Sequence, residues 1–336
     1  MPPVAFSFAP YEDAGAQPNV IVDGTATTNK TLTLSHWPGS PTLPASLQAD
    51  LSAEMAFRYL DHPDALHGRA QVVSNNHFDQ DGLVSIFALV DPTAARARRA
   101  ILEDLAAAGD FATYRSRDAA RASMVISAFT DPARTPLGPL PTDYAEATAH
   151  LYFEALGRLP ELVDDIQRYH HLWADEDTQL TESEDAVASG LVGIEEHPDV
   201  DLAVVTVTGE KRWSGHRFGG RRYDGVHPMA IHNATPCTAL LLVAGGQYRF
   251  TYRYETWVQY RSRRLPSRVD LTALAQELSA ADDVTWAADP IDDLTPELQP
   301  AGTSFISPSA LVDTVLRHLR TAPPAFDPFT RRDLHT

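Results

Sequence analysis

Cysteine is nearly absent from this sequence, whose 336 residues include only Cys237. A single cysteine excludes an internal disulfide framework, and with it the class of small secreted domains held together by such bonds. Because Cys237 follows a proline and precedes an apolar run, we expect a small buried hydrophobic side chain instead of a nucleophile. This cysteine usage favours a reducing, cytoplasmic compartment.

Long apolar runs are absent too. No stretch of about 18 consecutive apolar residues occurs, so the sequence predicts no membrane-spanning helix. The first residues lack a basic region followed by an apolar core, and we therefore expect no secretory signal. Hydrophobic residues nevertheless make up 43% of the chain, enough to bury the cores of two domains or of one large domain.

Positive charge is scarce as well. The chain has 27 Lys and Arg residues against 45 Asp and Glu residues, a formal net charge of -18. Long duplex nucleic acid and anionic membranes repel a surface of this sign, so we expect neither as a partner. A small phosphorylated substrate, held by a local basic pocket and a metal, is compatible with the charge. We expect such a small-molecule partner, and formation of a homodimer stays open.

The order of predicted elements indicates an α/β fold. Strands and helices alternate over residues 19–110, which is typical of a mostly parallel sheet with flanking helices, and we assign residues 19–196 to this domain. Residues 1–18 are rich in Pro and Ala and are expected to form a flexible N-terminal arm. Residues 197–336 contain β-branched and aromatic runs, which predict a smaller α+β domain that binds substrate.

The most informative segment begins with a short apolar run, for which we expect a buried strand over residues 70–75, and leads into a polar turn. The turn reads His77-Phe78-Asp79-Gln80-Asp81-Gly82, and a helical pattern continues to about Val90. Imidazole and carboxylate groups so close together suit Mn²⁺, Fe²⁺, Zn²⁺ or Mg²⁺, and Gly82 is expected to allow a tight turn. A solvated Asp-Gly turn is the alternative.

This turn resembles the first motif of the DHH phosphoesterases, a family of two-domain α/β hydrolases with two-metal sites. Three further segments resemble the family's other motifs. Asp23 ends a predicted strand, as in the second motif, and His36 lies in Ser35-His36-Trp37 where the family has Asp-His-His. Asp110, followed by Phe111, resembles the fourth motif. Because the first motif comes after the second and third here, the resemblance implies a rearranged order of strands.

The resemblance implies a site for two divalent cations, for which we expect Mn²⁺, with Fe²⁺, Zn²⁺ and Mg²⁺ as alternatives. By this resemblance, one cation would be held by His77, Asp79 and Asp23. The other would be held by Asp81, His36 and Asp110, with Asp23 as a bridging ligand. Asp23, His36 and Asp81 are the expected catalytic residues. Two such cations would polarise a phosphoryl or carbonyl oxygen and activate a water molecule.

The family's Gly-Gly-Gly-His phosphate cradle has no counterpart in the sequence. A loop-like stretch over residues 216–233 mixes glycine, arginine and histidine, and it could replace the cradle or be a basic hairpin loop. A second basic stretch near residue 261 could bind phosphate or form ion pairs with the acidic first domain. From these two stretches the candidate substrate-binding residues are Arg217, Arg221, Arg222, His227, His232 and Arg261.

We therefore expect a metal-dependent hydrolase that acts on a phosphoester or phosphoanhydride, with a small, nucleotide-like substrate. The missing phosphate cradle motivates an alternative, in which the same metals serve to cleave an amide or another carbonyl compound. Ser35, which stands where the family has an acid, motivates a third hypothesis of a catalytically inactive binding protein.

Overall fold

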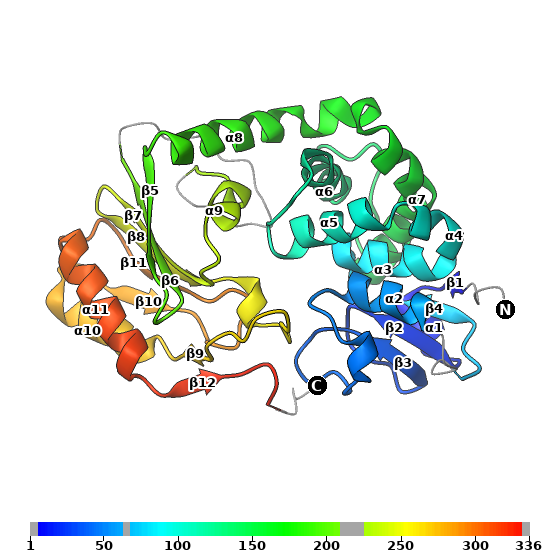
Figure 1. Cartoon of the computed structure of the whole chain (residues 1–336), viewed down its shortest axis with the longest axis horizontal. Helices are drawn as coiled ribbons and strands as arrows, with labels where there is room; N and C mark the ends of the chain where they lie inside the picture. The colour runs from blue at the N-terminus through cyan, green and yellow to red at the C-terminus, as the bar shows by residue number, and fades with distance from the viewer. Residues whose placement is uncertain (1–5, 63–67, 209–224, 331–336) are drawn as a thin grey trace. The chain divides into compact units, whose positions relative to one another are not determined.

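The computed structural model describes residues 6–62, 68–208 and 225–330. These residues form two compact units, which meet at Asp177 and Thr178. The protein is a mixed α/β structure, in agreement with the predicted fold class (Figure 1). None of the helices formed by the described residues combines the length and the apolar character that crossing a bilayer requires.

The first unit contains a four-stranded sheet whose neighbouring strands are all parallel. Its order is β1-β4-β2-β3, and the strands are β1 (Ser7–Phe8), β4 (Val72–Ser74), β2 (Asn19–Val22) and β3 (Lys30–Leu34). Val20 lies opposite Val73 on one side and Leu32 on the other. Strand β2 is buried along its whole length, as its run of apolar β-branched residues predicts for the centre of a parallel sheet.

Helices pack around this sheet and extend the core of the first unit. The innermost, α3, is buried over nearly its whole length and contacts both α2 and α5. A side chain begins α3: the Asp79 carboxylate accepts a hydrogen bond from Gly82 N at 2.8 Å. The helices of this unit are α1 (Tyr11–Ala14), α2 (Ser52–Asp61), α3 (Gln80–Val90), α4 (Pro92–Ala97), α5 (Arg99–Asp110), α6 (Arg117–Phe129) and α7 (Tyr144–Asp164).

Helix α8 (His170–Ala188) contains the boundary between the units, and the second unit is built on a six-stranded mixed sheet. Only the β6–β7 pair is parallel among the neighbouring strands of this sheet, as far as the described residues form it. In spatial order its strands are β10 (Trp286–Ala288), β11 (Glu297–Pro300), β8 (Gln247–Tyr252), β7 (Ala239–Ala244), β6 (Leu202–Val207) and β5 (Val192–His197).

Alternating side chains cover the two faces of this sheet. Leu241 packs on one face against α10 (Thr272–Ala281) and α11 (Pro308–Thr321), whereas Leu242 packs on the other against α9 (Pro228–Ala234). Figure 1 shows these helices on the two faces of the sheet. Cys237 belongs to the second cluster and is buried, as its sequence context predicts. A separate two-stranded sheet pairs β9 (Arg268–Val269) with β12 (Pro324–Phe326).

Two features differ from the sequence-based expectations. The segment predicted as a flexible arm contributes β1 and α1 over residues 7–14, because Ser7 and Phe8 pair with β4 and Ala14 is fully buried. Its Pro and Ala content suggested disorder, but the short strand completes the edge of the sheet. The chain passes from the first unit to the second within α8, whereas the acidic stretch predicts a boundary at residues 196 and 197.

Candidate metal centre

Three candidate ligands follow directly after neighbouring parallel strands. Asp23 comes immediately after β2, His36 comes two residues after β3, and His77 comes three residues after β4. Because parallel strands end at the same edge of a sheet, residues far apart in the sequence meet there. The sequence pattern thus positions an acid and two imidazoles at the carboxyl edge of the first unit's sheet.

Helix ends supply the remaining carboxylates. Asp79 caps the N-terminus of α3, and Asp81 lies in the first turn of the same helix. Asp110 is the last residue of α5. The six residues that the resemblance implies as metal ligands thus come together in one place, although 87 positions separate Asp23 from Asp110 (110 − 23).

Asp23 belongs to both of the groups into which these ligands fall. In the first group, His77 Nε2 is 3.4 Å from Asp23 Oδ2 and 3.0 Å from Asp79 Oδ2. In the second, His36 Nε2 is 3.3 Å from Asp23 Oδ1, 3.5 Å from Asp110 Oδ2 and 3.9 Å from Asp81 Oδ2. The membership of the two groups is the one that the resemblance implies. Each group could hold a metal ion.

A backbone carbonyl orients the His36 ring. His36 Nδ1 lies 2.5 Å from the carbonyl oxygen of Asp50. A carbonyl can only accept a hydrogen bond, so Nδ1 must carry a hydrogen and donate it. In the neutral imidazole, Nε2 then carries the lone pair, and it is this atom that faces the carboxylates of Asp23 and Asp110.

The beginning of α2 fixes two of the carboxylates. The backbone N–H groups of Ser52 and Ala53 donate to the two oxygens of Asp81 at 2.8 and 2.7 Å, as the positive end of a helix favours. The Ser52 hydroxyl donates to Asp23 Oδ1 at 2.9 Å. A single turn of helix therefore holds one carboxylate from each of two other elements.

The backbone of Asp23 adopts a conformation that side chains disfavour. Its φ angle is +45°, in the left-handed region where glycine is preferred and where few other residues are found. The adjacent residue is Gly24, and a Cβ there would lie 2.1 Å from Asn76 Oδ1. The chain therefore turns sharply after β2 and directs the Asp23 side chain between the two histidines. Strain of this kind collects at functional sites.

Electrostatics tie Asp23 to both imidazoles. Burial alone would raise the pKa of Asp23, but the close contacts and charges of His36 and His77 outweigh it and hold the pKa below its usual range. Burial would lower the pKa of His36, yet Asp23 and Asp81 raise it to about 9. Burial would lower the pKa of His77 too, but the charge of Asp79 and the contact between His77 and Asp23 raise it to about 12. Without a cation, both imidazoles are therefore protonated at neutral pH.

The two most enclosed acids shift in the opposite direction to Asp23. Burial, followed by the charge of Asp23, raises the pKa of Asp81 well above its usual range. Burial, followed by the charges of Asp81 and Asp79, does the same for Asp110. The carboxylates of the cluster cannot all ionise unless positive charge compensates the repulsion between them. The cluster thus favours either protons or a metal ion in its centre.

Two carboxylate oxygens of the cluster have the properties expected of metal-ligand atoms. Oδ2 of Asp23 and Oδ2 of Asp110 are buried and accept no hydrogen bond from the described residues. Buried polar atoms without hydrogen bonds are rare because each costs free energy, so such atoms call for an explanation. Their carboxylate and imidazole neighbours are suitable ligands for a divalent cation, and the residues therefore fit one.

Two aromatic residues that support the cluster were not assigned a role from sequence. The ring of Trp37 is stacked on that of His77, with centroids 5.2 Å apart. The buried hydroxyl of Tyr152, in α7, donates to the carbonyl oxygen of His77 at 2.8 Å. Trp37 stood out as the replacement for a family histidine, but only the structure gives its contact. Nothing in the sequence around Tyr152 links it to a turn 75 positions earlier.

Gly82 has a different role from the predicted one. It lies inside α3 with an ordinary negative φ angle, so the chain does not need glycine there for its turn. Space is the reason instead, because a Cβ at Gly82 would lie 2.3 Å from Asn75 Nδ2 and 2.6 Å from the Tyr152 hydroxyl. Glycine allows α3 to approach the turn that carries His77.

The candidate substrate-binding residues lie in the second unit or outside the described residues. Arg217, Arg221 and Arg222 lie outside the described residues. His227 caps α9, with its Nδ1 accepting from Met229 N at 3.2 Å, and His232 lies in the same helix; both are buried. Arg261 is exposed and lines a pocket of the second unit. Their role in binding a substrate stays a prediction.

The fold and the site define a class: a mixed α/β protein with a buried Asp and His cluster that could hold a metal ion. Within that class, the chain belongs to a family of unknown function, DUF6687, which it matches over residues 4–330. No curated protein and no solved structure matches the chain.

Proposed function

We propose that this protein is a metal-dependent hydrolase of the DHH phosphoesterase type, with a centre for two divalent cations. One observation carries the proposal: the Asp23 carboxylate turns Oδ1 to His36 and Oδ2 to His77, at 3.3 and 3.4 Å. A carboxylate shared between two groups of ligands in this way has the arrangement of a bridging ligand in a two-metal site.

The donor atoms favour hard or borderline cations. Carboxylates and imidazoles without thiolates suit Mn²⁺, which we propose as the physiological ion, and also Fe²⁺, Zn²⁺ and Mg²⁺. One ion would be held by His77, Asp79 and Asp23. The other would be held by His36, Asp81 and Asp110, with Asp23 between them.

When bound, the cations would supply Lewis-acid activation of a phosphoryl oxygen and of the attacking water. The protein's own part is to hold the donors in place beforehand. The Asp50 carbonyl fixes the His36 ring, and the first turn of α2 fixes Asp81. Partners of this kind orient ligands and strengthen metal binding. Burial of His36 and Asp81 keeps bulk water from their half of the cluster, whereas His77 and Asp79 are partly exposed.

Ser35-His36-Trp37 stands where the DHH phosphoesterases have Asp-His-His. The contacts of Ser35 and Trp37 support a site with fewer metal ligands than that family has. The Ser35 hydroxyl accepts a hydrogen bond from Trp37 N at 3.3 Å. The Trp37 ring covers His77 where the family has a second imidazole. We propose that the six remaining donors suffice for hydrolysis of a small phosphorylated substrate.

The first test counts metal ions. Protein stripped with a chelator and reconstituted with Mn²⁺ should bind about two equivalents per chain, measured by inductively coupled plasma mass spectrometry after desalting. Asp79→Ala and Asp81→Ala should each bind less. Asp118→Ala is a matched control, since this acid forms an exposed ion pair with Arg121 outside the cluster. Full-length folded protein that binds no metal, or equal binding by all variants, would overturn the proposal.

The second test identifies the bond. Model phosphodiesters, phosphomonoesters, nucleotides and small amides are incubated with the Mn²⁺-loaded protein, and Asp81→Ala is the inactive reference. We expect hydrolysis of at least one phosphoester class that disappears in Asp81→Ala. Amide hydrolysis without any phosphoester hydrolysis would refute the phosphoesterase assignment, and metal binding without turnover of either class would refute the assignment of a hydrolase.

A further inference from the structure

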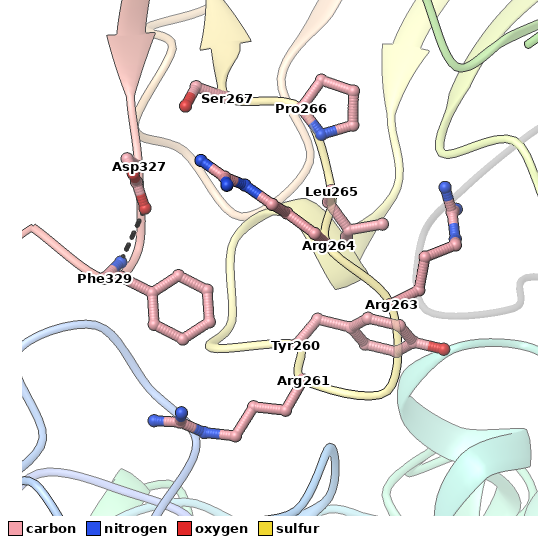
Figure 2. A pocket seen from close by; sticks show the side chains of 9 residues that line it. All are labelled: Tyr260, Arg261, Arg263, Arg264, Leu265, Pro266, Ser267, Asp327 and Phe329. Atoms are coloured by element: carbon pink, nitrogen blue, oxygen red, sulfur yellow. Dashed lines mark hydrogen bonds between the residues drawn. The ribbon is translucent and has the colours of Figure 1, made fainter.

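A pocket of about 480 Å³ lies in the second unit, in the loop between β8 and β9 and beside the chain that follows β12 (Figure 2). Its size falls within the range of small-molecule sites. Its lining includes Tyr260, Arg261, Arg263, Arg264, Ser267 and Phe329. All of them belong to one unit, so the pocket is complete within that unit.

Three arginines give the pocket a charge opposite to that of the protein. Arg263 is paired with Asp201, whose Oδ1 lies 2.8 Å from its Nη1. Arg261 donates to Gln259 Oε1 at 2.9 Å. Arg264 forms no ion pair with any described residue, and Figure 2 shows its side chain extending across the pocket toward Ser267. A guanidinium without a carboxylate partner is notable in a chain with a net charge of -18.

One carboxylate also lines the pocket, and it bears on which anion could bind. Asp327 accepts a hydrogen bond from Phe329 N at 2.9 Å, which uses part of its capacity as an acceptor (Figure 2). The lining holds three guanidinium groups, those of Arg261, Arg263 and Arg264, and the single carboxylate of Asp327. The lining therefore remains positive, as an anion site requires.

An exposed aromatic ring forms another part of the wall. Phe329 is 50% exposed, so half of its ring surface is open to a ligand. The Arg261 guanidinium lies over the same ring, 5.1 Å from its centroid. The guanidinium and the ring are thus stacked on each other, and a nucleobase can extend such a stack of planar groups.

We propose that this pocket binds a mononucleotide, with its phosphate at Arg264 and Ser267 and its base against Phe329. Guanidinium groups bind phosphate through short, charge-assisted hydrogen bonds, and a serine hydroxyl can add one more. The stack of planar groups accounts for a base in addition to the phosphate. This inference does not rest on the metal centre of the first unit, because none of the pocket's residues belongs to that unit.

The test measures binding to the full-length protein by isothermal titration calorimetry at low salt. A chelator is present, so that the metal centre contributes nothing. The probes are AMP, UMP, adenosine and inorganic phosphate. We expect saturable binding of AMP and UMP, weaker binding of inorganic phosphate and none of adenosine. If no nucleotide binds, the metal content that tests the proposed hydrolase is unaffected. Each of the two proposals can therefore fail separately.

Variants locate the site. Arg264→Gln should weaken AMP binding about tenfold or more, the loss expected for one charge-assisted hydrogen bond to phosphate. Phe329→Ala should weaken AMP binding about fivefold or more and leave inorganic phosphate unchanged, because only the base uses the ring. Arg317→Gln is the matched control: this arginine pairs with Glu277 on the same unit, outside the pocket.

Circular dichroism melting confirms that each variant is folded before it is compared. Three results would overturn the proposal: no saturable AMP binding up to millimolar concentration, equal AMP affinity in Arg264→Gln and Arg317→Gln, or adenosine binding as tight as that of AMP. Inorganic phosphate that binds as well as AMP, with no effect of Phe329→Ala, would also overturn it, because no base would then extend the stack.

Discussion

Asp23 is the residue on which the candidate metal centre depends most. Its two carboxylate oxygens face different imidazoles, and its backbone holds a left-handed conformation to allow this. The same side chain accepts a hydrogen bond from the Ser52 hydroxyl. Removing its charge should therefore affect both halves of the cluster, whereas removing Asp79 or Asp110 should affect one half.

Replacing Asp23 with Asn tests this dependence. The amide keeps the size of the side chain but loses the negative charge that a bridging ligand needs. We expect Asp23→Asn to lower the number of bound Mn²⁺ ions by at least one per chain and to reduce hydrolysis by about a hundredfold or more. Mass spectrometry of the metal content and initial rates measure the two effects. Two tightly bound ions in Asp23→Asn would contradict a bridging role.

Ser52 is a supporting residue whose contribution should be smaller. Ser52→Ala removes the hydroxyl that donates to Asp23 and keeps the backbone N–H that donates to Asp81. Loss of a partner that orients a ligand costs about 10- to 100-fold in metal affinity, so we expect a weakening in that range. Competition with a fluorescent chelator measures it. Ser309→Ala, in an exposed position of α11, is the control that should bind metal normally.

At the scale of the element, α3 depends on close contacts instead of on helix propensity. Alanine is favoured over glycine inside a helix by about 1 kcal/mol. At Gly82, however, a methyl group would meet Asn75 and Tyr152 at distances far below van der Waals contact. The steric cost should therefore exceed the gain in propensity.

The pair of variants Gly82→Ala and Gly157→Ala separates these two effects. We expect Gly82→Ala to lower the free energy of unfolding by about 1–3 kcal/mol, as overpacking does, and to weaken metal binding through the His77 turn. At Gly157, in α7, a Cβ would point into space that the described residues leave open, so Gly157→Ala should be neutral or stabilising by up to about 1 kcal/mol. Urea denaturation compares them, and equal effects would show that space at Gly82 does not matter.

The sequence predicts the strand ends of the site well and its supporting contacts poorly. Asp23 and His77 follow apolar runs, and the topology of a parallel sheet is enough to bring such residues together. The contact of Tyr152 with the His77 carbonyl depends on how α7 packs, which no local pattern encodes. The burial of Ala14 likewise arises from tertiary contacts that override the composition of the N-terminal segment.

For the whole molecule, the cluster links stability to pH. The pKa of His36 is raised from 6.5 to about 9, so its contribution to stability is fully present below pH 6.5 and is lost as the pH rises through about 9. His77 and the raised pKa values of Asp81 and Asp110 act in the same direction. Asp23, whose pKa is lowered, acts in the opposite direction, but its titration is complete well below pH 6.5.

The titration of His36 alone should therefore make the metal-free protein less stable between pH 6.5 and pH 9 by an amount on the order of 2 kcal/mol, and His77 should add to this loss. Thermal melts in the presence of a chelator measure this change. His36→Gln is the comparison, because the pH dependence that His36 contributes should be absent from it. The same slope in both proteins would show that His36 does not titrate in this range. Saturating Mn²⁺ should remove most of the slope, since a cation replaces the protons.

Because Trp37 is stacked on His77, its fluorescence can serve as an intrinsic reporter of metal binding. An indole ring in contact with an imidazole reports whether that imidazole carries a proton or a ligand, because a neighbouring cation changes the electrostatic field at the ring. Tryptophan emission should then change as Mn²⁺ is titrated into the stripped protein, and the change should shrink in Trp37→Phe. Occupancy of the half of the cluster that contains His77 could thus be followed in real time, without any label.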